Sequence, residues 1–205
     1  EIYQCDWSSD VCSSDLANLE EDIFNAVAHN HYERAFAAML RERGVTHVPV
    51  EEKRRSVIDG TPVKSLDFLV LANDGRWFVT DVKGRRFPGG PPGRPRRVLE
   101  CWATLDDVDG LERWARRFGG GCEGLLVFPY LVDPDEADSC AWGDPCRHEG
   151  RDYRVLAVPV SEYRRHMRVR SPRWGTVDLP AAAYRSVVRP LSHFTGEGDP
   201  WGLPA

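Results

Sequence analysis

Three charged residues stand inside stretches that otherwise read as buried strands. Asp67 lies in "SLDFLVLA", and Asp81 and Lys83 lie in "RWFVTDVKG". Burying a charge is costly unless it is paired or binds a metal, and perturbed charges gather at functional sites. Carboxylate oxygens are the ligands that Mg²⁺ prefers, and a lysine can stabilise phosphate charge. These residue types predict a metal-dependent phosphodiesterase site.

The turn between the two stretches decides whether the aspartates can share an ion. The strands are predicted at 66–72 and 76–84, with Asn73, Asp74 and Gly75 between them. A three-residue loop that ends on a left-handed glycine would place Asp67 opposite Asp81, on one face of the sheet. A two-residue turn would put them on opposite faces. Gly75 stands last, which favours the three-residue loop and a G1-type bulge.

The elements around this hairpin indicate an α/β layer fold. A helix is predicted from Asn18 to a stop at Gly44, with Glu33 at the border of its apolar stripe, and "THVPVEEKRR" predicts a short strand. Both hairpin strands are apolar on both faces, so helices should cover both sides of the sheet. A second helix around Trp102–Phe118 and a buried strand, "GLLVFPYLV", follow. The stretch 133–152 reads as a polar insertion, followed by a strand, a short helix capped by Ser161, and a last strand and helix.

The order of these elements and the charged residues resemble the PD-(D/E)XK nuclease superfamily over about residues 18–130. The resemblance implies a restriction-endonuclease-like αβββαβ core, with a mixed sheet flanked by helices on both faces. "HYERAF" also resembles the signature of the HYExAFE family, although Ala37 replaces its final Glu. Leu66 stands where the superfamily often has proline.

The resemblance also implies roles for individual residues. Asp67, Asp81 and the Val82 carbonyl would bind Mg²⁺, with Mn²⁺ as a possible substitute, and Glu33 would bind a second metal or a bound water. Lys83 points to the same strand face as Asp81 and would orient water or stabilise the phosphate. The expected substrate is nucleic acid, with DNA as the default by analogy.

Arginines follow the proposed site along the chain. The loop after Lys83 carries five of them, which are expected to contact phosphates: Arg85, Arg86, Arg94, Arg96 and Arg97. A second run, "YRRHMRVRSPRW", adds five more. The formal net charge is −5, so nucleic-acid binding must depend on such local patches.

Three other interpretations remain open at this stage. Asp81 and Lys83 could form an ordinary ion pair at a sheet end, with Asp67 capping a loop. The fold could be a catalytically inactive binding or scaffold module. Cys140, Cys146 and His148 could hold a structural zinc ion, although no fourth ligand is obvious nearby.

The rest of the composition bounds the class of protein. Residues 1–16 lack the periodicity of the remainder and are predicted to be an artefactual or disordered leader, with residues 17–205 forming one domain that has a C-terminal extension. The six cysteines form no CxxC pair, and no signal peptide or apolar membrane span is recognised. We expect a cytoplasmic protein with no membrane partner; the sequence leaves the oligomeric state open.

Overall fold

The computed structural model describes residues 30–50, 56–58, 60–90, 98–136 and 142–196. Its helices are α2 (His31–Glu42), α3 (Leu105–Phe118), α4 (Val160–His166), α5 (Ala181–Val187) and α6 (Ser192–Thr195), with a 3-10 turn at Pro134–Glu136. The strands are β1 (Thr46–Pro49), β2 (Ser56–Ile58), β3 (Thr61–Val63), β4 (Phe68–Leu71), β5 (Trp77–Val82), β6 (Arg85–Arg86), β7 (Ala103–Thr104), β8 (Glu123–Val132), β9 (Asp144–His148), β10 (Arg151–Pro159), β11 (Arg168–Ser171), β12 (Thr176–Asp178) and β13 (Arg189–Pro190).

A mixed sheet forms the centre of the molecule. Its strands run in the order β1-β4-β5-β8-β10-β13, and β6 and β9 pair with β8 and β10. The β5–β8 and β6–β8 pairs are parallel, and the other pairs in this sheet are antiparallel. The order α2, β1, β4, β5, α3, β8 is the αβββαβ arrangement predicted from the sequence, with the β2–β3 hairpin inserted after β1.

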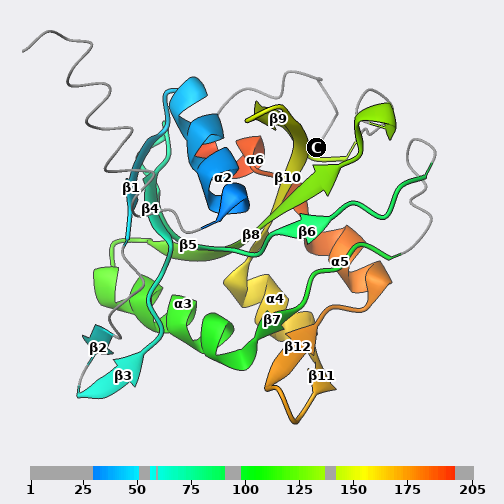
Figure 1. Ribbon diagram of the computed structural model, residues 1–205. Helices are drawn as coiled ribbons and strands as arrows, with labels where there is room; N and C mark the ends of the chain where they lie inside the picture. Colours follow the sequence, from blue (N-terminus) through cyan, green and yellow to red (C-terminus); the bar gives the residue numbers. More distant parts are fainter. Residues whose placement is uncertain (1–29, 51–55, 59, 91–97, 137–141, 197–205) are drawn as a thin grey trace, which may run out of the picture.

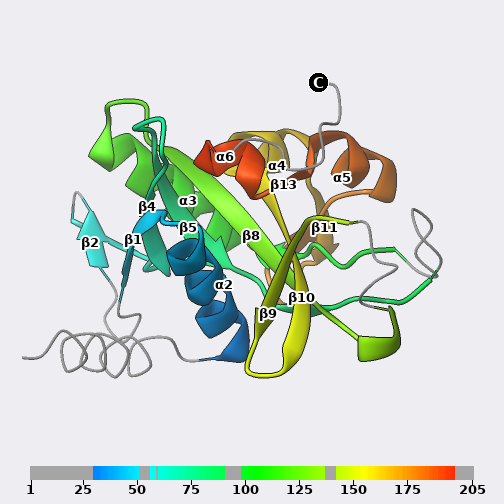
Figure 2. The same ribbon diagram turned by 90° about the horizontal axis from the view of Figure 1, so that it is seen from above.

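Helices cover both faces of this sheet, as the two-sided apolar strands predicted. One apolar core lies under α2 and α6 and contains Phe36, Phe68 and Phe78. The other lies under α3, α4 and α5 and contains Val79 and Leu126. Figure 1 shows α2 and α6 on one side of the sheet and α3 and α4 on the other, and Figure 2 views the molecule from the α2 side. The α/β fold class is therefore confirmed.

The β4–β5 hairpin has the predicted three-residue turn. The Ala72 N–H donates to the Arg76 carbonyl at 2.9 Å, and the Gly75 N–H donates to the Ala72 carbonyl at 2.9 Å. Gly75 has φ +86°, in the left-handed region that favours glycine. The register pairs Phe68 with Thr80 and Leu71 with Trp77, and Asp67 directly precedes this ladder.

Two predicted helix starts are different in the structure. Helix α2 starts at His31, because Asn30 has extended backbone angles and its side chain accepts hydrogen bonds from the backbone N–H groups of Tyr32 and Glu33. Residues 18–29 of the predicted helix and the predicted leader lie outside the described residues. Helix α4 starts at Val160, directly after Pro159, without a side-chain cap from Ser161.

Two segments predicted to be irregular contain strands. The polar insertion includes β9, which pairs with β10 from Asp144↔Val155 to His148↔Arg151. Arg85 and Arg86, predicted to begin a loop, form β6 beside β8. Both are short and depend on pairing with long buried strands, which local composition does not reveal. Within the described part of the chain, no helix has the length and apolar character needed to cross a membrane.

Candidate active site

Asp81 lies on strand β5, and its side chain points into the core on the α3 side of the sheet. The neighbouring residues Thr80 and Val82 point the other way, since side chains alternate along a strand. Val82 belongs to the core under α2, and Val79 belongs to the core under α3. Asp81 is 1% exposed, so its carboxylate needs positive partners within the protein.

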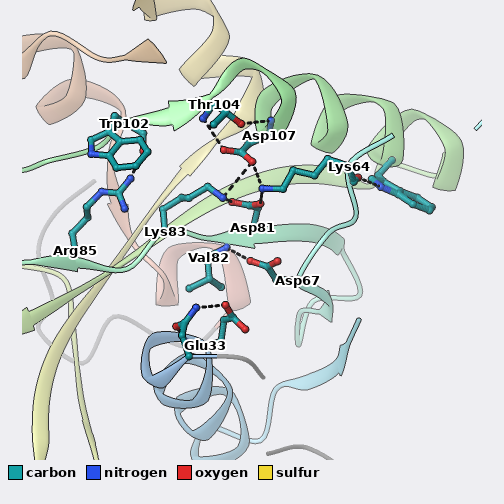
Figure 3. Close-up of polar contacts among 12 residues, drawn as sticks. Glu33, Lys64, Asp67, Asp81, Val82, Lys83, Arg85, Trp102, Thr104 and Asp107 are labelled. Carbon is teal, nitrogen blue, oxygen red and sulfur yellow. Dashed lines mark hydrogen bonds and ion pairs between the residues drawn. The ribbon is translucent and has the colours of Figure 1, made fainter. Parts of the chain in front are cut away.

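Two lysines and a second aspartate supply those partners (Figure 3). Lys83 forms a close ion pair with Asp81, and its Nζ lies 3.3 Å from Asp107 Oδ1. Lys64 Nζ lies 3.4 Å from Asp81 Oδ1 and makes a close contact with Asp107. Two carboxylates and two ammonium groups therefore form a neutral cluster, and both aspartates are buried. We call these four residues the Asp81 cluster.

Local structure fixes the position of Asp107. It is the third residue of α3 and forms a capping box with Thr104: the Thr104 N–H donates to Asp107 Oδ2 at 2.7 Å, and the Asp107 N–H donates to Thr104 Oγ1 at 3.1 Å. Lys64 is fixed through its backbone, because Trp114 Nε1–H of α3 donates to the Lys64 carbonyl at 2.9 Å. The sequence analysis missed both Lys64 and Asp107. The T-x-x-D pattern at 104–107 was the available signal for Asp107.

The electrostatics of the cluster separate its two aspartates. Burial raises the pKa of Asp81, and although Lys83 opposes this shift, the nearby Asp107 adds to it. Burial acts on Asp107 in the same direction, but Lys83 and Lys64 outweigh it and hold the pKa of Asp107 below its ordinary value. Burial alone would lower the pKa of Lys64, whereas Asp81 and Asp107 raise it. Asp107 is thus the more firmly ionised carboxylate, and Lys64 remains charged.

Asp67 directly precedes β4, and both its backbone and its side chain hydrogen-bond to β5. Its backbone N–H donates to the Thr80 carbonyl at 2.9 Å, and its Oδ2 accepts from the Val82 N–H at 2.6 Å. Asp67 is therefore buried beside β5 at the level of Asp81, but its carboxylate bonds to a backbone amide while that of Asp81 bonds to lysines. The strand pairing ends at Phe68↔Thr80, and Asp67 bonds to Thr80 and Val82 of β5, so the expectation that Asp67 and Asp81 share one metal ion stays a prediction.

Glu33 lies in the first turn of α2, where Asn30 Nδ2–H donates to its carboxylate. Because α2 covers the face opposite α3, Glu33 and Asp81 lie on different sides of β5 (Figure 3). The expectation that Glu33 binds a second metal or a bound water stays a prediction, and the structure places Glu33 on the other side of β5 from Asp81 (Figure 3). The helix was predicted correctly at this position, but the face it covers is decided by the tertiary packing.

The carboxylate oxygens of Asp67 and Asp81 are of the type that hard divalent cations prefer. The Lys64 ammonium lies between the carboxylates of Asp81 and Asp107. Among the described residues, no three His, Cys, Asp or Glu side chains gather so that they could hold a metal alone. The Val82 carbonyl and water molecules would have to complete the ligand set.

The residues of the zinc alternative have other surroundings. The Cys146 thiol is buried under α2 and donates to the Ala35 carbonyl at 3.3 Å. Burial raises the pKa of Cys146 to about 11, which disfavours the thiolate that zinc requires. His148 Nε2 lies 3.5 Å from Glu149, and Cys140 lies outside the described residues. The thiol of Cys146 is best explained as part of the core.

The structure separates the predicted phosphate-binding arginines into three groups. Arg85 is buried: its guanidinium lies 4.0 Å from the Trp102 ring centroid and donates to the carbonyls of Gly84 and Trp102. The expectation that Arg85 contacts phosphate from a mobile loop is therefore wrong, because strand β6 turns it inward. Arg86 is exposed and forms an ion pair with Asp133 at 2.8 Å. Arg94, Arg96 and Arg97 lie outside the described residues.

Comparison with solved structures reveals a likeness to a DNA-processing enzyme. The chain is similar to Hjc, a Holliday junction resolvase from Archaeoglobus fulgidus, an archaeal hyperthermophile, with 14% sequence identity and a TM-score of 0.45. The match covers 80% of this chain and 98% of that chain. No family model matches the chain, and the comparison with curated proteins found no match. This level of likeness does not transfer an activity or residue roles, so function has to be argued from the site.

Proposed function

We propose that this protein is a metal-dependent phosphodiesterase that cleaves nucleic acid, with DNA as the expected substrate. The observation that carries the proposal is the buried carboxylate of Asp81 beside Lys83, with the carboxylate of Asp67 hydrogen-bonded to Val82, the residue between them. Burying such a group of charges adds little to the stability of a fold, since well-packed apolar residues of similar volume would stabilise it equally well. Charges kept in this arrangement are better explained by a ligand or a reaction.

Each residue has a defined role in this proposal. Asp67, Asp81 and the Val82 carbonyl would hold Mg²⁺ or Mn²⁺. A divalent ion there would supply Lewis-acid activation of water and neutralise charge on the phosphate. Lys83 would donate hydrogen bonds to the phosphate oxygens or to the attacking water, because its ammonium lies on the same strand face as Asp81. Glu33 would bind a second metal ion or a metal-bound water from the α2 side of β5 (Figure 3).

Lys64 and Asp107 add a feature that the motif alone does not contain. The Lys64 ammonium competes for the Asp81 carboxylate that a cation would need. The side chain of Lys64 is 36% exposed and carries a flexible four-carbon stem, so it can move towards solvent more easily than Lys83, which is 15% exposed. We therefore assign Lys64 as a counter-ion that a divalent cation displaces.

A substrate panel tests the proposed function. Purified protein is incubated with supercoiled plasmid, single-stranded DNA and RNA, each with Mg²⁺, Mn²⁺ or chelator. The expected result is cleavage of DNA with either metal and none with chelator. Cleavage that persists in chelator, or no cleavage of any substrate with either metal, would overturn the proposal.

A catalytically inactive binding or scaffold module is the second candidate. It is favoured by the fact that the Asp81 cluster is already neutral, with each carboxylate paired to ammonium groups. Calorimetric titration with Mn²⁺ separates the two candidates. If the protein is a phosphodiesterase, the wild type binds Mn²⁺ and Asp81→Asn binds it more weakly. If it is a scaffold whose aspartates are neutralised by Lys64 and Lys83, neither protein shows saturable Mn²⁺ binding.

A further inference from the structure

The β11–β12 hairpin exposes a tryptophan and an aliphatic side chain at the surface. Its turn spans residues 172–175, "PRWG", where Trp174 is 70% exposed. Val169 on β11 is also largely exposed. Exposing a large aromatic ring to water at a hairpin tip is unfavourable, and exposed rings of this kind are typical of contact surfaces.

Two arginines beside Trp174 have aromatic neighbours rather than acidic ones. The Arg173 guanidinium lies 5.3 Å from the Trp174 ring centroid, and that of Arg170 lies 5.4 Å from the Trp102 ring centroid. Within the described residues, neither arginine belongs to an ion pair. The neighbouring arginines of the same run do have acidic partners in the structure: Arg164 with Asp109 and Glu112, Arg165 with Glu162, and Arg168 with Asp178. Arg170 and Arg173 therefore place two positive charges without acidic partners among the described residues at the hairpin.

The local backbone explains why Arg170 stands out from the hairpin. The ladder pairs Val169 with Val177 and then Ser171 with Thr176, which leaves Arg170 as an extra residue at a register shift. Such a bulge re-aims a side chain and strengthens the local twist. Gly175 closes the turn with φ +56°, a backbone angle suited to glycine.

The hairpin is attached to the helix that carries Asp107. The Leu105 N–H, at the start of α3, donates to the Gly175 carbonyl at 2.8 Å. Strand β12 pairs with β7 through Thr176↔Thr104, and Thr104 is the residue that caps α3 together with Asp107. Figure 1 shows β7, β12 and β11 as a small sheet beside the start of α3. The tip therefore has a fixed position relative to the Asp81 cluster.

A second connection runs through Trp102. Its ring lies between two arginine contacts in the structure, one with Arg170 from the hairpin and one with Arg85, which follows Lys83 by two residues. Trp102 thus connects the hairpin, through Arg170, to the buried Arg85 beside the proposed site. On the surface, an exposed tryptophan next to arginines suits a polymer that has both phosphates and flat bases.

We propose that the tip of the β11–β12 hairpin binds a single-stranded segment of nucleic acid, with an unpaired base stacked on Trp174 and the flanking phosphates bound by Arg170 and Arg173. This inference rests on the proposed function for the identity of the polymer. Stacking on an aromatic ring tolerates any base, because every base has a flat π face, and arginine adds charge-based attraction. The protein should therefore prefer substrates with unpaired nucleotides next to the cut, without strong sequence preference.

A binding experiment without cleavage tests this inference. Fluorescence anisotropy measures the Kd of labelled single-stranded and fully paired DNA of equal length, with Asp81→Asn as the background and chelator present. In this background Trp174→Ala is expected to weaken binding of single-stranded DNA by about tenfold, in line with the loss of one stacked base. Trp174→Phe should retain most of the affinity, and the paired duplex should lose much less.

Trp77→Ala is the matched control, because Trp77 is another exposed tryptophan, 40% exposed, at the far end of β5 from Asp81. It should leave both Kd values unchanged. Equal affinity of Trp174→Ala and its parent for single-stranded DNA would overturn the inference, as would a Trp174→Phe variant as weak as Trp174→Ala. If Trp174 governs binding but the wild-type protein cleaves nothing, only the proposed function fails; if it cleaves and Trp174→Ala binds normally, only the hairpin assignment fails.

Discussion

Lys64 contacts the Asp81 carboxylate, which the proposed function assigns to a divalent cation. Its Nζ contacts carboxylates from strand β5 and helix α3, two segments that no short motif links. The motif D-x-K therefore describes only half of the charges at this centre. Whether the centre takes up a metal depends on how easily the Lys64 ammonium gives up its two carboxylates.

The first prediction concerns this competition. Lys64→Met should bind Mn²⁺ more tightly, with a Kd lower by about tenfold, which corresponds to about 1.4 kcal/mol, because the carboxylates lose a competing cation. Calorimetric titration at neutral pH measures the Kd. Arg86→Met is the control, since Arg86 is exposed and pairs with Asp133 away from the cluster. A folded Lys64→Met protein with unchanged or weaker Mn²⁺ binding would show that Lys64 is no competitor.

The second prediction separates two roles of Asp67. In Asp67→Asn the side-chain oxygen can still accept from the Val82 N–H, so the free energy of unfolding should fall by only about 1 kcal/mol. The negative charge is removed, so Mn²⁺ affinity should fall by at least about tenfold. Urea unfolding and calorimetry measure the two quantities. If Asp67→Asn binds Mn²⁺ like the wild type, Asp67 serves the hairpin ladder alone.

At the scale of elements, the hairpin and the helices that bury it were readable from the sequence. Gly75 after Asn73 and Asp74 specified the turn, and the turn specified the register that pairs Phe68 with Thr80. The second helix was expected around Trp102–Phe118, but the Thr104 cap that sets its start at Leu105 was not recognised. These features depend on backbone geometry and local hydrogen bonds, which act over a few residues.

The parts that the sequence did not reveal depend on contacts between distant segments. Lys64 meets Asp107 across 43 positions of the chain, and the face covered by α2, which separates Glu33 from Asp81, is chosen by packing. The inward position of Arg85 depends on the parallel pairing of β6 with β8 and on the Trp102 ring. None of these contacts leaves a periodic pattern.

The third prediction tests how the turn supports the site. Gly75→Ala should destabilise the protein by about 1–2 kcal/mol, since an L-residue is strained at φ +86°. The added Cβ would meet nothing within 4 Å, so the cost is one of backbone conformation. Chemical unfolding measures it. Asn73→Ala is the control in the same turn, because Asn73 is exposed and its backbone bond to Thr195 would remain. Equal stability of both variants would contradict the importance of the left-handed glycine.

At the scale of the whole molecule, an acidic protein is proposed to bind an acidic polymer. The formal charge of −5 makes general attraction unfavourable, so binding must depend on arginines without acidic partners. Several arginines already form ion pairs with acidic residues of the protein, among them Arg164, Arg165 and Arg168. The expected contacts are therefore the hairpin tip and the arginine-rich segment after Lys83.

The fourth prediction follows for that segment. Replacing Arg94, Arg96 and Arg97 with alanine should weaken binding of duplex DNA and reduce the slope of log K against log salt, by about 0.9 for each phosphate that the variant no longer neutralises. Anisotropy titrations over a range of salt concentrations measure the slope. Arg165→Ala is the control. Arg165 is paired with Glu162 at 3.0 Å, so this variant should leave the slope unchanged. A triple variant with the wild-type slope would remove this segment from the binding surface.

The most direct test of the account measures single-turnover cleavage by active-site variants. The rate constant is determined with Mg²⁺ for the wild type, Asp81→Asn, Lys83→Ala and the control Asp74→Asn, an exposed aspartate in the turn of the same hairpin. We predict that Asp81→Asn and Lys83→Ala remain folded and lose at least about 100-fold in rate, since each removes a group that stabilises developing charge, while Asp74→Asn matches the wild type. Cleavage by Asp81→Asn or Lys83→Ala at the wild-type rate would contradict the assignment of this centre as the active site.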